Sequence, residues 1–309
     1  MRPFRFGYQL GASSADELVA KARAAEAAGF DVLHTWDHVI AGDEGWSPLA
    51  PLMAAAAVTS RLRLCPLVLN NDFHHPVHLA REIASMDRLT GGRIELGLGA
   101  GHAFTEYTAV GAPFDPPRVR KERLGEAVEI LRKLLAGDEV THHGEHYRLD
   151  GVRTMSALQE RLPILVGVNG KGALAHAARQ ADIIGLTMLG RTLEDGHRHT
   201  VNWEPSRIDT AVDYIRQCAG DRWHELELNA LVQAVVVTDD PPSEAARLAE
   251  RVPGLTIEDA LAAPFLAFGT HHEIAAHLQA CRERWGISYF SVRSIDAFAP
   301  VIEILRVAG

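Results

Sequence analysis

Cysteine is scarce in this sequence: Cys65, Cys218 and Cys281 are spread widely through 309 residues. An odd number of distant cysteines argues against a disulfide framework or a zinc knuckle, and it fits a reducing cytoplasm. No apolar run is long enough to span a bilayer. The first residues lack the apolar core of a signal peptide, so they are expected to begin a strand. We therefore expect a cytoplasmic protein with no membrane partner.

Basic residues are also scarce relative to acidic ones. The sequence has 31 Lys and Arg residues and 40 Asp and Glu residues, which give a formal net charge of −9. No long basic block occurs, which argues against nucleic acid as the main partner. The composition, 47% hydrophobic and 23% charged, is that of a folded globular protein. No low-complexity linker or repeat divides the chain, so we expect one domain over residues 1–309.

The sequence does contain a regular alternation of short apolar runs with amphipathic helical patterns. Strands are expected at residues 3–10, 30–36, 62–69, 93–99, 163–168, 182–187, 228–237 and 287–292. Helical patterns between them end on glycine, as at Gly29 and Gly286. Strands that alternate with helices imply parallel pairing, and eight units at this length predict a TIM (β/α)8 barrel with insertions. A doubly wound sheet has the same pattern and stays as the alternative.

Polar residues and glycines gather where the expected strands end. The second strand runs into Trp36, Asp37 and His38, and the fourth into a glycine run that ends at His102. The opposite strand ends carry little beyond arginine and proline. Barrel enzymes place their active sites at the carboxyl ends of the strands. The asymmetry therefore predicts a functional face there. The longer interruptions lie at 100–118, at 138–162, with a hairpin expected around His143 and Gly144, and between the sixth and seventh strands.

The loop after the fifth expected strand has the pattern of an anion site. Gly167, Gly170 and Gly172 allow successive backbone N–H groups to turn inward, and a helical pattern begins directly afterwards. The positive end of that helix favours an anion such as phosphate, to which Lys171 could add charge. The alternative is a glycine-rich turn that merely joins a strand to a helix.

The segment GLGAGH, residues 97–102, invites comparison with the dinucleotide fingerprint. That motif needs glycine or alanine at its sixth position and a helix that opens at once. Here the sixth residue is His102, and no helix is expected before Pro117. The fingerprint is therefore weak, although glycines at these positions still permit the close approach of a flat ligand.

His38 is the leading candidate for an acid or base, because imidazole changes charge near neutral pH. A core histidine bonded to a carbonyl is the alternative. Neighbours in an extended strand point to opposite faces, so one of Asp37 and His38 could face the barrel mouth while the other braces the loop. Histidines also cluster at 74–78 and 142–146, but no HExxH occurs and no metal site is expected.

Four segments together carry a family resemblance: residues 24–38, 67–102, 163–187 and 268–292. They resemble the bacterial luciferase-like monooxygenase superfamily, and within it most nearly the oxidoreductases that depend on the deazaflavin coenzyme F420. The resemblance covers nearly the whole chain in order. It implies a TIM barrel with insertions, a homodimer, and F420 or FMN bound in the barrel mouth.

The resemblance also implies roles for particular residues. His38, with Asp37, would line the deazaflavin ring near the carbon that exchanges hydride, and His102 is a second candidate for the acid or base. Leu67, Val68 and Asn70 would back the ring, where the family often has a non-prolyl cis bulge. The cofactor's side chain would follow Gly99, Gly101 and His102. Its phosphate would be held by Val168, Asn169, Gly170 and Lys171.

One departure concerns the substrate. The glucose-6-phosphate dehydrogenases of the family carry glutamate where this chain has His102, so the resemblance does not carry that sugar phosphate over. We expect an F420-dependent oxidoreductase that moves hydride between the deazaflavin and a small organic molecule, with His38 as acid or base. Two alternatives remain: a reduced-FMN-dependent monooxygenase on the same fold, and a flavin- or deazaflavin-binding protein without catalysis.

Overall fold

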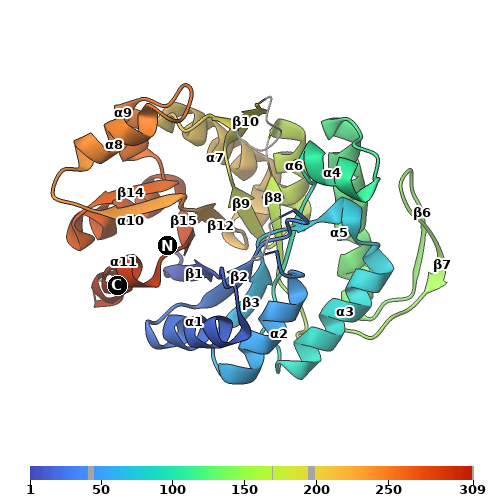
Figure 1. Cartoon of the computed structure of the whole chain (residues 1–309). Coiled ribbons are helices and arrows are strands. Elements are labelled where there is room, and N and C mark those ends of the chain that lie inside the picture. The colour runs from blue at the N-terminus through green and yellow to red at the C-terminus, as the bar shows by residue number, and fades with distance from the viewer. Residues whose placement is uncertain (41–44, 169, 194–198, 308–309) are drawn as a thin grey trace.

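The computed structural model describes residues 1–40, 45–168, 170–193 and 199–307. Its centre is a sheet of parallel strands in the order β3-β2-β1-β15-β12-β9-β8-β5-β4, with helices arranged around it (Figure 1). These strands are β1 (Arg5–Gln9), β2 (Val32–Thr35), β3 (Arg63–Pro66), β4 (Leu69–Asn70), β5 (Leu96–Gly99), β8 (Ile164–Val168), β9 (Ile183–Leu186), β12 (Glu227–Leu231) and β15 (Ile287–Val292).

The two ends of this strand order meet. β3 and β4 are successive parts of one expected strand, and the peptide bond between Leu67 and Val68, which lies between them, is cis. β4 pairs with β5, while Leu64 of β3 forms a parallel bridge to Ile94 just before β5. The strands therefore close into a barrel, and the predicted TIM barrel is confirmed. A doubly wound sheet is excluded because it has two open edges.

Helices cover the outside of the barrel (Figure 1). They are α1 (Ala15–Ala27), α2 (Leu49–Val58), α3 (Pro76–Leu89), α5 (Pro117–Ala136), α6 (Lys171–Gln180), α7 (Pro205–Ala219), α10 (His271–Trp285) and α11 (Ile295–Val307). Local sequence sets many of their ends. In α10, Thr270 and Glu273 form a capping box, and Gly286 ends the helix with a left-handed φ of 75°. Glycine takes that conformation without the strain a side chain would add.

Further helices and strands lie outside the central barrel. They are α4 (Phe104–Val110), α8 (Pro241–Ala249), α9 (Ile257–Ala262), the 3-10 turns Asn71–Phe73 and Gly220–His224, and three strand pairs. These pairs are β6 (Val140–His143) with β7 (Arg148–Val152), β10 (Leu189–Thr192) with β11 (His199–Val201), and β13 (Ala234–Val237) with β14 (Leu266–Gly269). The β6–β7 pair confirms the hairpin expected around His143.

Two expectations about these elements are wrong. The run 228–237 is not one strand: the backbone leaves the barrel after β12, and Gln233 N donates to Phe265 O as β13 turns to pair with β14. Both halves are apolar, so the hydrophobic pattern could not show where the chain changes partner. The segment 100–118 was expected to lack a helix, yet α4 lies within it. α4 spans seven residues, too few for helical periodicity to stand out.

A buried histidine sits inside the barrel. The side chain of His34 is fully buried, with Nδ1 3.0 Å from the carbonyl oxygen of Cys65 and Nε2 2.9 Å from Tyr289 Oη and 3.1 Å from Ser291 Oγ. Burial lowers the pKa of His34 to about 4, because the charged imidazolium is disfavoured away from water. A Cβ on neighbouring Gly7 would collide with the His34 ring. The glycine therefore makes room for a neutral histidine.

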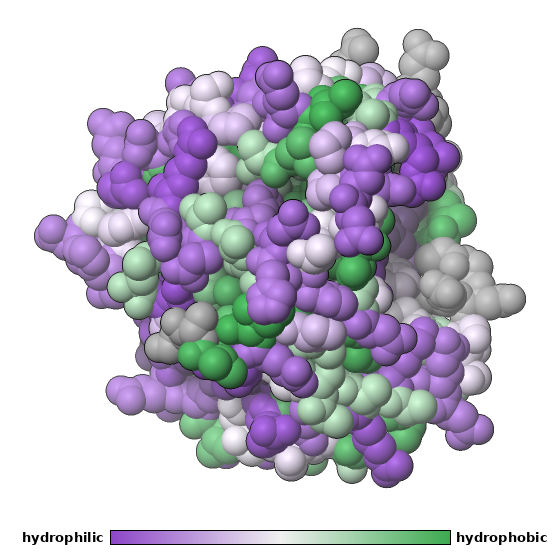
Figure 2. All heavy atoms as spheres, turned by 90° about the vertical axis from the view of Figure 1, so that its left-hand side faces the viewer, coloured by the Kyte–Doolittle hydropathy of each residue, from purple (hydrophilic) through white to green (hydrophobic). Residues whose placement is uncertain are grey.

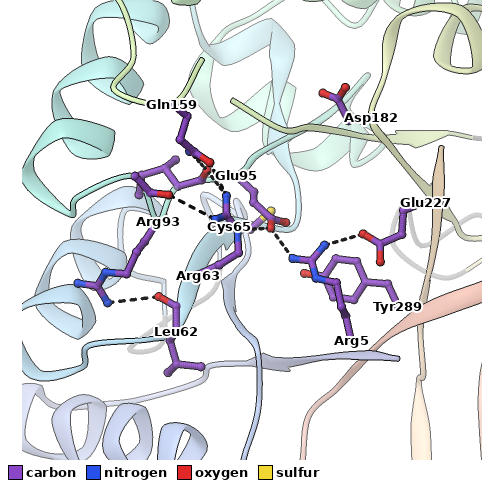
Figure 3. Close-up of polar contacts among 12 residues, drawn as sticks. Arg5, Leu62, Arg63, Cys65, Arg93, Glu95, Gln159, Asp182, Glu227 and Tyr289 are labelled. Carbon is purple, nitrogen blue, oxygen red and sulfur yellow. Dashed lines mark hydrogen bonds and ion pairs between the residues drawn. The ribbon is translucent and has the colours of Figure 1, made fainter. Parts of the chain in front are cut away.

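The amino ends of the strands hold an ionic network (Figure 3). Arg5 of β1 pairs with Glu95 and, at 2.5 Å, with Glu227 of β12, while Arg63 Nε lies 2.5 Å from Glu95. Burial raises the pKa of Glu227 despite the opposing effect of Arg5. Sequence reasoning expected little beyond arginine and proline at this end, and it missed the buried carboxylates. Features at this end of a barrel generally serve stability.

The outer surface is mixed in character. On the side where α8 to α11 lie, hydrophilic side chains cover most of the face and separate smaller hydrophobic areas (Figure 2). Exposed apolar residues on α9 and α11 include Ile257 and Val307. Within the described parts of the chain, none of the helices is both long and apolar enough to cross a membrane.

Candidate functional site

A cavity of about 440 Å³ lies at the carboxyl ends of the barrel strands. Its lining includes the predicted acid–base candidates and the residues expected to back a ring: Asp37, His38, His102, Leu67, Val68 and Asn70. The glycine runs after β5 and within β8 contribute Gly99, Gly101, Gly167 and Val168. The structure therefore brings together predicted residues from four places, namely the carboxyl ends of β2, β3–β4, β5 and β8, which meet at one end of the barrel.

His38 is held by a carboxylate that sequence reasoning missed. Glu106 of α4 places Oε1 2.9 Å from His38 Nδ1. The Glu106 side chain is 4% exposed, whereas that of His38 is 40% exposed. An ionised carboxylate can only accept a hydrogen bond, so Nδ1 carries the proton and Nε2 is the nitrogen left for other partners. Glu106 was missed because α4 was expected to be loop. This chain has histidine at position 102, where the glucose-6-phosphate dehydrogenases carry glutamate. Glu106, four residues later, nevertheless supplies a carboxylate to the cavity.

Two more imidazole rings, those of His102 and His199, continue in a row from His38. The rings of His38 and His102 meet edge to face with centroids 5.7 Å apart, and the centroids of His102 and His199 are 5.2 Å apart. All three line the cavity, with His199 contributed by β11. His199 was not predicted, because it lies in an insertion far from any expected strand end. The cavity is thus rich in imidazole groups, each of which can both donate and accept a hydrogen bond.

Asp37 braces the neighbouring loop. Its Oδ2 accepts a hydrogen bond of 2.9 Å from the backbone N–H of Asn70 and lies 3.1 Å from His74 Nε2. The Asn70 side chain in turn accepts from Tyr107 Oη at 3.1 Å. This agrees with the expectation that one of Asp37 and His38 would brace the loop. These contacts fix the ends of β2 and β4 relative to each other and so position His38.

The wall beside the Leu67–Val68 cis bulge is kept flat by glycines. A Cβ on Gly99 would lie 2.7 Å from Val68 Cγ2, and one on Gly167 would lie 3.3 Å from Val68 Cγ1. Gly101 has a left-handed φ of 71°, and Arg120 donates to its carbonyl oxygen. Side chains at Gly99 and Gly167 would crowd Val68, whereas a side chain at Gly101 would collide with Tyr107 and Asn70. A cavity of this volume with a smooth wall fits a planar ring system of flavin size.

A second cavity of about 450 Å³ adjoins the first, and Lys121 and Leu189 line both. Gly170 and Lys171, predicted to hold phosphate, line the second cavity at the start of α6. A Cβ on Gly170 would lie 3.4 Å from Lys121 Nζ. The ammonium group and the positive end of α6 therefore point to one place, as an anion site requires. Asn169, predicted to share this role, lies outside the described residues.

The basic residues at the start of α5 have separate tasks. Arg118 pairs with Glu122 at 2.6 Å, Arg123 pairs with Asp72 at 2.9 Å, and Arg120 donates to backbone carbonyls. Lys121 differs because it lines both cavities. Burial, followed by the charge of Arg120, lowers the pKa of Lys121. Among these four residues, Lys121 is therefore best placed to receive an anionic group.

The histidine clusters have contacts of their own. His142 lies 3.3 Å from Glu126, and His143 lies 2.6 Å from Asp150. In the described part of the chain, one group of possible ligands has its atoms within 4.8 Å of one another, namely Glu122, Glu145 and His146. Glu122 already accepts from Arg118. We assign this group no metal.

The family model described as luciferase-like monooxygenase matches residues 1–289. The chain is 30% identical over 282 residues to the F420-dependent glucose-6-phosphate dehydrogenase of Microbacterium testaceum, covering 81% of each protein. It is 35% identical over 187 residues to the protein of the same name from Nakamurella multipartita, covering 58% of this chain and 55% of the relative. The chain thus spans little more than half of that relative. It belongs to the luciferase-like monooxygenase family.

A solved structure agrees on the fold. The coenzyme F420-dependent tetrahydromethanopterin reductase from Methanopyrus kandleri superposes with a TM-score of 0.77, covering 98% of this chain and 100% of that one, at 18% identity. At this identity the likeness concerns the fold alone. It supports the barrel architecture predicted from the strand pattern.

Proposed function

We propose that this protein binds coenzyme F420 in the barrel mouth and catalyses hydride transfer between the cofactor and a small organic substrate. Relatives at 30–35% identity carry F420-dependent names. The cavity, its glycine-flanked wall and the adjoining cationic site match a ring joined to a phosphate-bearing tail. On this proposal, Val68 and Gly99 border the ring, while Gly170, Lys171 and Lys121 receive the phosphate.

The observation that carries this proposal is the His38–Glu106 pair beside the glycine wall. When bound, the deazaflavin supplies a carbon that can accept or give a hydride. His38 then exchanges the accompanying proton with a heteroatom of the substrate through Nε2, which Glu106 leaves available by holding Nδ1. Oxidation of an alcohol places its hydroxyl proton on His38, and reduction of a carbonyl takes that proton back. Asp37 keeps the loop of His38 in place through Asn70 and His74.

The first experiment is an oxygen-free titration of the purified protein with F420 and, separately, with FMN, following the fluorescence of each cofactor. Tight binding of F420 and weak binding of FMN would support the proposal. The reverse preference would refute it. Absence of binding by either cofactor would overturn the assignment of the glycine wall and the Lys121 site.

A second candidate function is reduced-FMN-dependent monooxygenation, which the description of the family favours. A deazaflavin carries hydride but reacts poorly with oxygen, so the cofactor decides between the two chemistries. Tight FMN binding together with substrate-dependent oxygen consumption would support this candidate. A non-catalytic binding protein would bind a cofactor yet show no turnover in either assay.

We further propose that the chain is a homodimer, acts in the cytoplasm and folds as one domain over residues 1–309. Sedimentation equilibrium tests the dimer and cell fractionation tests the location. A single calorimetric transition over the whole chain is expected for one domain, whereas two separated transitions would contradict it.

A further inference from the structure

Arg293 points into the cavity from the end of β15. Tyr289 and Ser291 of this strand contact His34 inside the barrel. Arg293 comes directly after the last residue of β15, at the carboxyl end of the barrel. It lines the cavity together with Gln9 and Gln233. These three residues come from the ends of β15, β1 and β12, which are adjacent in the barrel.

Neutral amides hold the guanidinium of Arg293. Its Nε donates to Gln9 Oε1 at 2.7 Å, and its Nη1 lies 2.9 Å from Gln233 Oε1 and 3.3 Å from the Gln233 carbonyl oxygen. Gln9 is 6% exposed, so this support is largely buried. Two amide oxygens fix the orientation of a planar guanidinium without neutralising its charge. A guanidinium has five N–H donors, so donors remain for a ligand.

Arg293 also lacks the carboxylate partner that other arginines of the barrel have. Arg5 and Arg63 pair with Glu95, and Arg123 pairs with Asp72. Across the ranges that the structure describes, no carboxylate forms an ion pair with Arg293. Arg293 itself is exposed, so the donors that Gln9 and Gln233 leave unused face the open cavity. A bound oxoanion would accept hydrogen bonds from these donors and balance the charge of the guanidinium.

The position of Arg293 separates it from the proposed cofactor site. The glycine wall and Lys121 belong to the side of β5, β8 and α5, whereas Arg293 and its two glutamines belong to β15, β1 and β12. β1 lies between β15 and β2, the strand that leads to His38. A molecule that contacts Arg293 can therefore reach towards His38 from the side opposite the glycine wall.

We propose that Arg293, oriented by Gln9 and Gln233, is the substrate-binding residue of this cavity and selects substrates that carry an oxoanion, a carboxylate or a phosphate. The proposal rests on the proposed function, because it takes the molecule bound at His38 to be the substrate. Arginine suits the role because its planar fork can donate two parallel hydrogen bonds to such a group. The reacting carbon of the substrate then lies between the anchored anion and His38.

The test uses three aromatic probes of similar shape, namely benzoate, phenyl phosphate and the neutral benzamide. Their affinities are measured by isothermal titration calorimetry on the full chain without cofactor. At least one anion is expected to bind about tenfold or more tightly than benzamide, and the anion that binds identifies carboxylate or phosphate as the preferred group. Arg293→Gln is expected to lower the affinity for that anion by about 10- to 100-fold, the range for loss of a charge-assisted hydrogen bond.

Further variants keep the result interpretable. Arg293→Lys keeps the charge and is expected to retain part of the affinity. Gln9→Glu supplies an internal carboxylate to Arg293. It is expected to lower the affinity for anions about as much as Arg293→Gln does. The control Arg216→Gln removes an arginine of α7 that pairs with Asp213, and it should change nothing.

Several outcomes would overturn the proposal. The first is that benzoate, phenyl phosphate and benzamide bind with equal affinity. The second is that folded Arg293→Gln binds the anion as tightly as wild type. The third is that Lys121→Gln loses anion binding while Arg293→Gln keeps it. F420 binding to wild type and to Arg293→Gln is measured separately by fluorescence and is expected to be the same. If F420 fails to bind while anions depend on Arg293, the proposed function fails and the anion site stands.

Discussion

Glu106 is almost entirely buried, and its Oε1 lies 2.9 Å from Nδ1 of the half-exposed His38. The pair joins a seven-residue helix to a loop that is 68 residues away in sequence. Neither residue type is unusual by itself. Their juxtaposition gives His38 a fixed tautomer and a fixed orientation, with Nε2 available for proton exchange.

Glu106→Gln is expected to lower kcat by about 10- to 100-fold while KM changes less than about threefold. The amide keeps the shape of Glu106, but it removes the negative charge and can donate to Nδ1, which favours the wrong tautomer of His38. Steady-state kinetics with F420 and an accepted substrate measure the effect. The control Glu122→Gln changes a carboxylate of α5 that pairs with Arg118. Equal losses in both variants would argue against a positioning role for Glu106.

His38→Ala is expected to lower turnover by about 10²- to 10⁴-fold and to leave F420 affinity within about tenfold, as loss of a general acid or base would. Single-turnover kinetics and fluorescence titration measure the two quantities separately. His78→Ala serves as the control, since His78 is exposed on α3. If His38→Ala turned over at the wild-type rate, the proton would have to move through another residue such as His102.

Lys121→Gln is expected to weaken F420 binding by about tenfold at low salt, with a smaller difference at high salt. The reason is that Lys121 lies beside Gly170 at the positive end of α6. Because burial and Arg120 lower the pKa of Lys121, its contribution should fade at a less alkaline pH than that of an ordinary lysine. Fluorescence titration from pH 7 to pH 10 tests this. Lys133→Gln, which removes an exposed lysine paired with Glu129, is the control. Identical affinity curves for wild type and Lys121→Gln would refute the role.

Gly7→Ala is expected to destabilise the fold by about 1–3 kcal/mol, because the new Cβ collides with His34 and would lie 2.8 Å from Ser291 Oγ. Denaturant unfolding measures the change in free energy. At Gly172 a Cβ would have no heavy atom within 4 Å, so Gly172→Ala should stay within about 0.5 kcal/mol of wild type. A Gly7→Ala variant as stable as wild type would show that His34 can move aside at little cost.

His34 should make the fold less stable in mild acid. Burial lowers its pKa to about 4 from an ordinary value of 6.5, so the unfolded chain binds a proton in this range and the folded chain does not. The contribution of neutral His34 to the free energy of unfolding is therefore fully present above pH 6.5. As the pH falls towards 4, that free energy decreases by up to about 3 kcal/mol. Unfolding free energies from pH 7.5 to pH 4.5 should fall less steeply in His34→Gln than in wild type. The exposed His224 provides the control through His224→Gln. Parallel curves for wild type and His34→Gln would contradict this account.

The sequence by itself determined the barrel, and it placed His38, Asp37 and the glycine runs at the carboxyl ends of the strands. Those features are local: the periodicity of strands and helices, glycine at helix ends and the residues that follow each strand can all be read without knowing what touches what. Because parallel strands share a direction, residues that follow different strands gather at one end of the barrel. Most of the predicted site therefore lines one cavity.

Only the tertiary structure decided which partners these residues have. Glu106 beside His38, Lys121 beside Gly170, and Arg293 between Gln9 and Gln233 are contacts between distant segments, and no local pattern encodes them. The split of the run 228–237 into β12 and β13 has the same cause, since an apolar strand pairs as well with β14 as with β15 until packing selects one. Side-chain chemistry was visible in the sequence. The electrostatic environment that directs it depends on burial and on long-range neighbours, and these exist only in the folded chain.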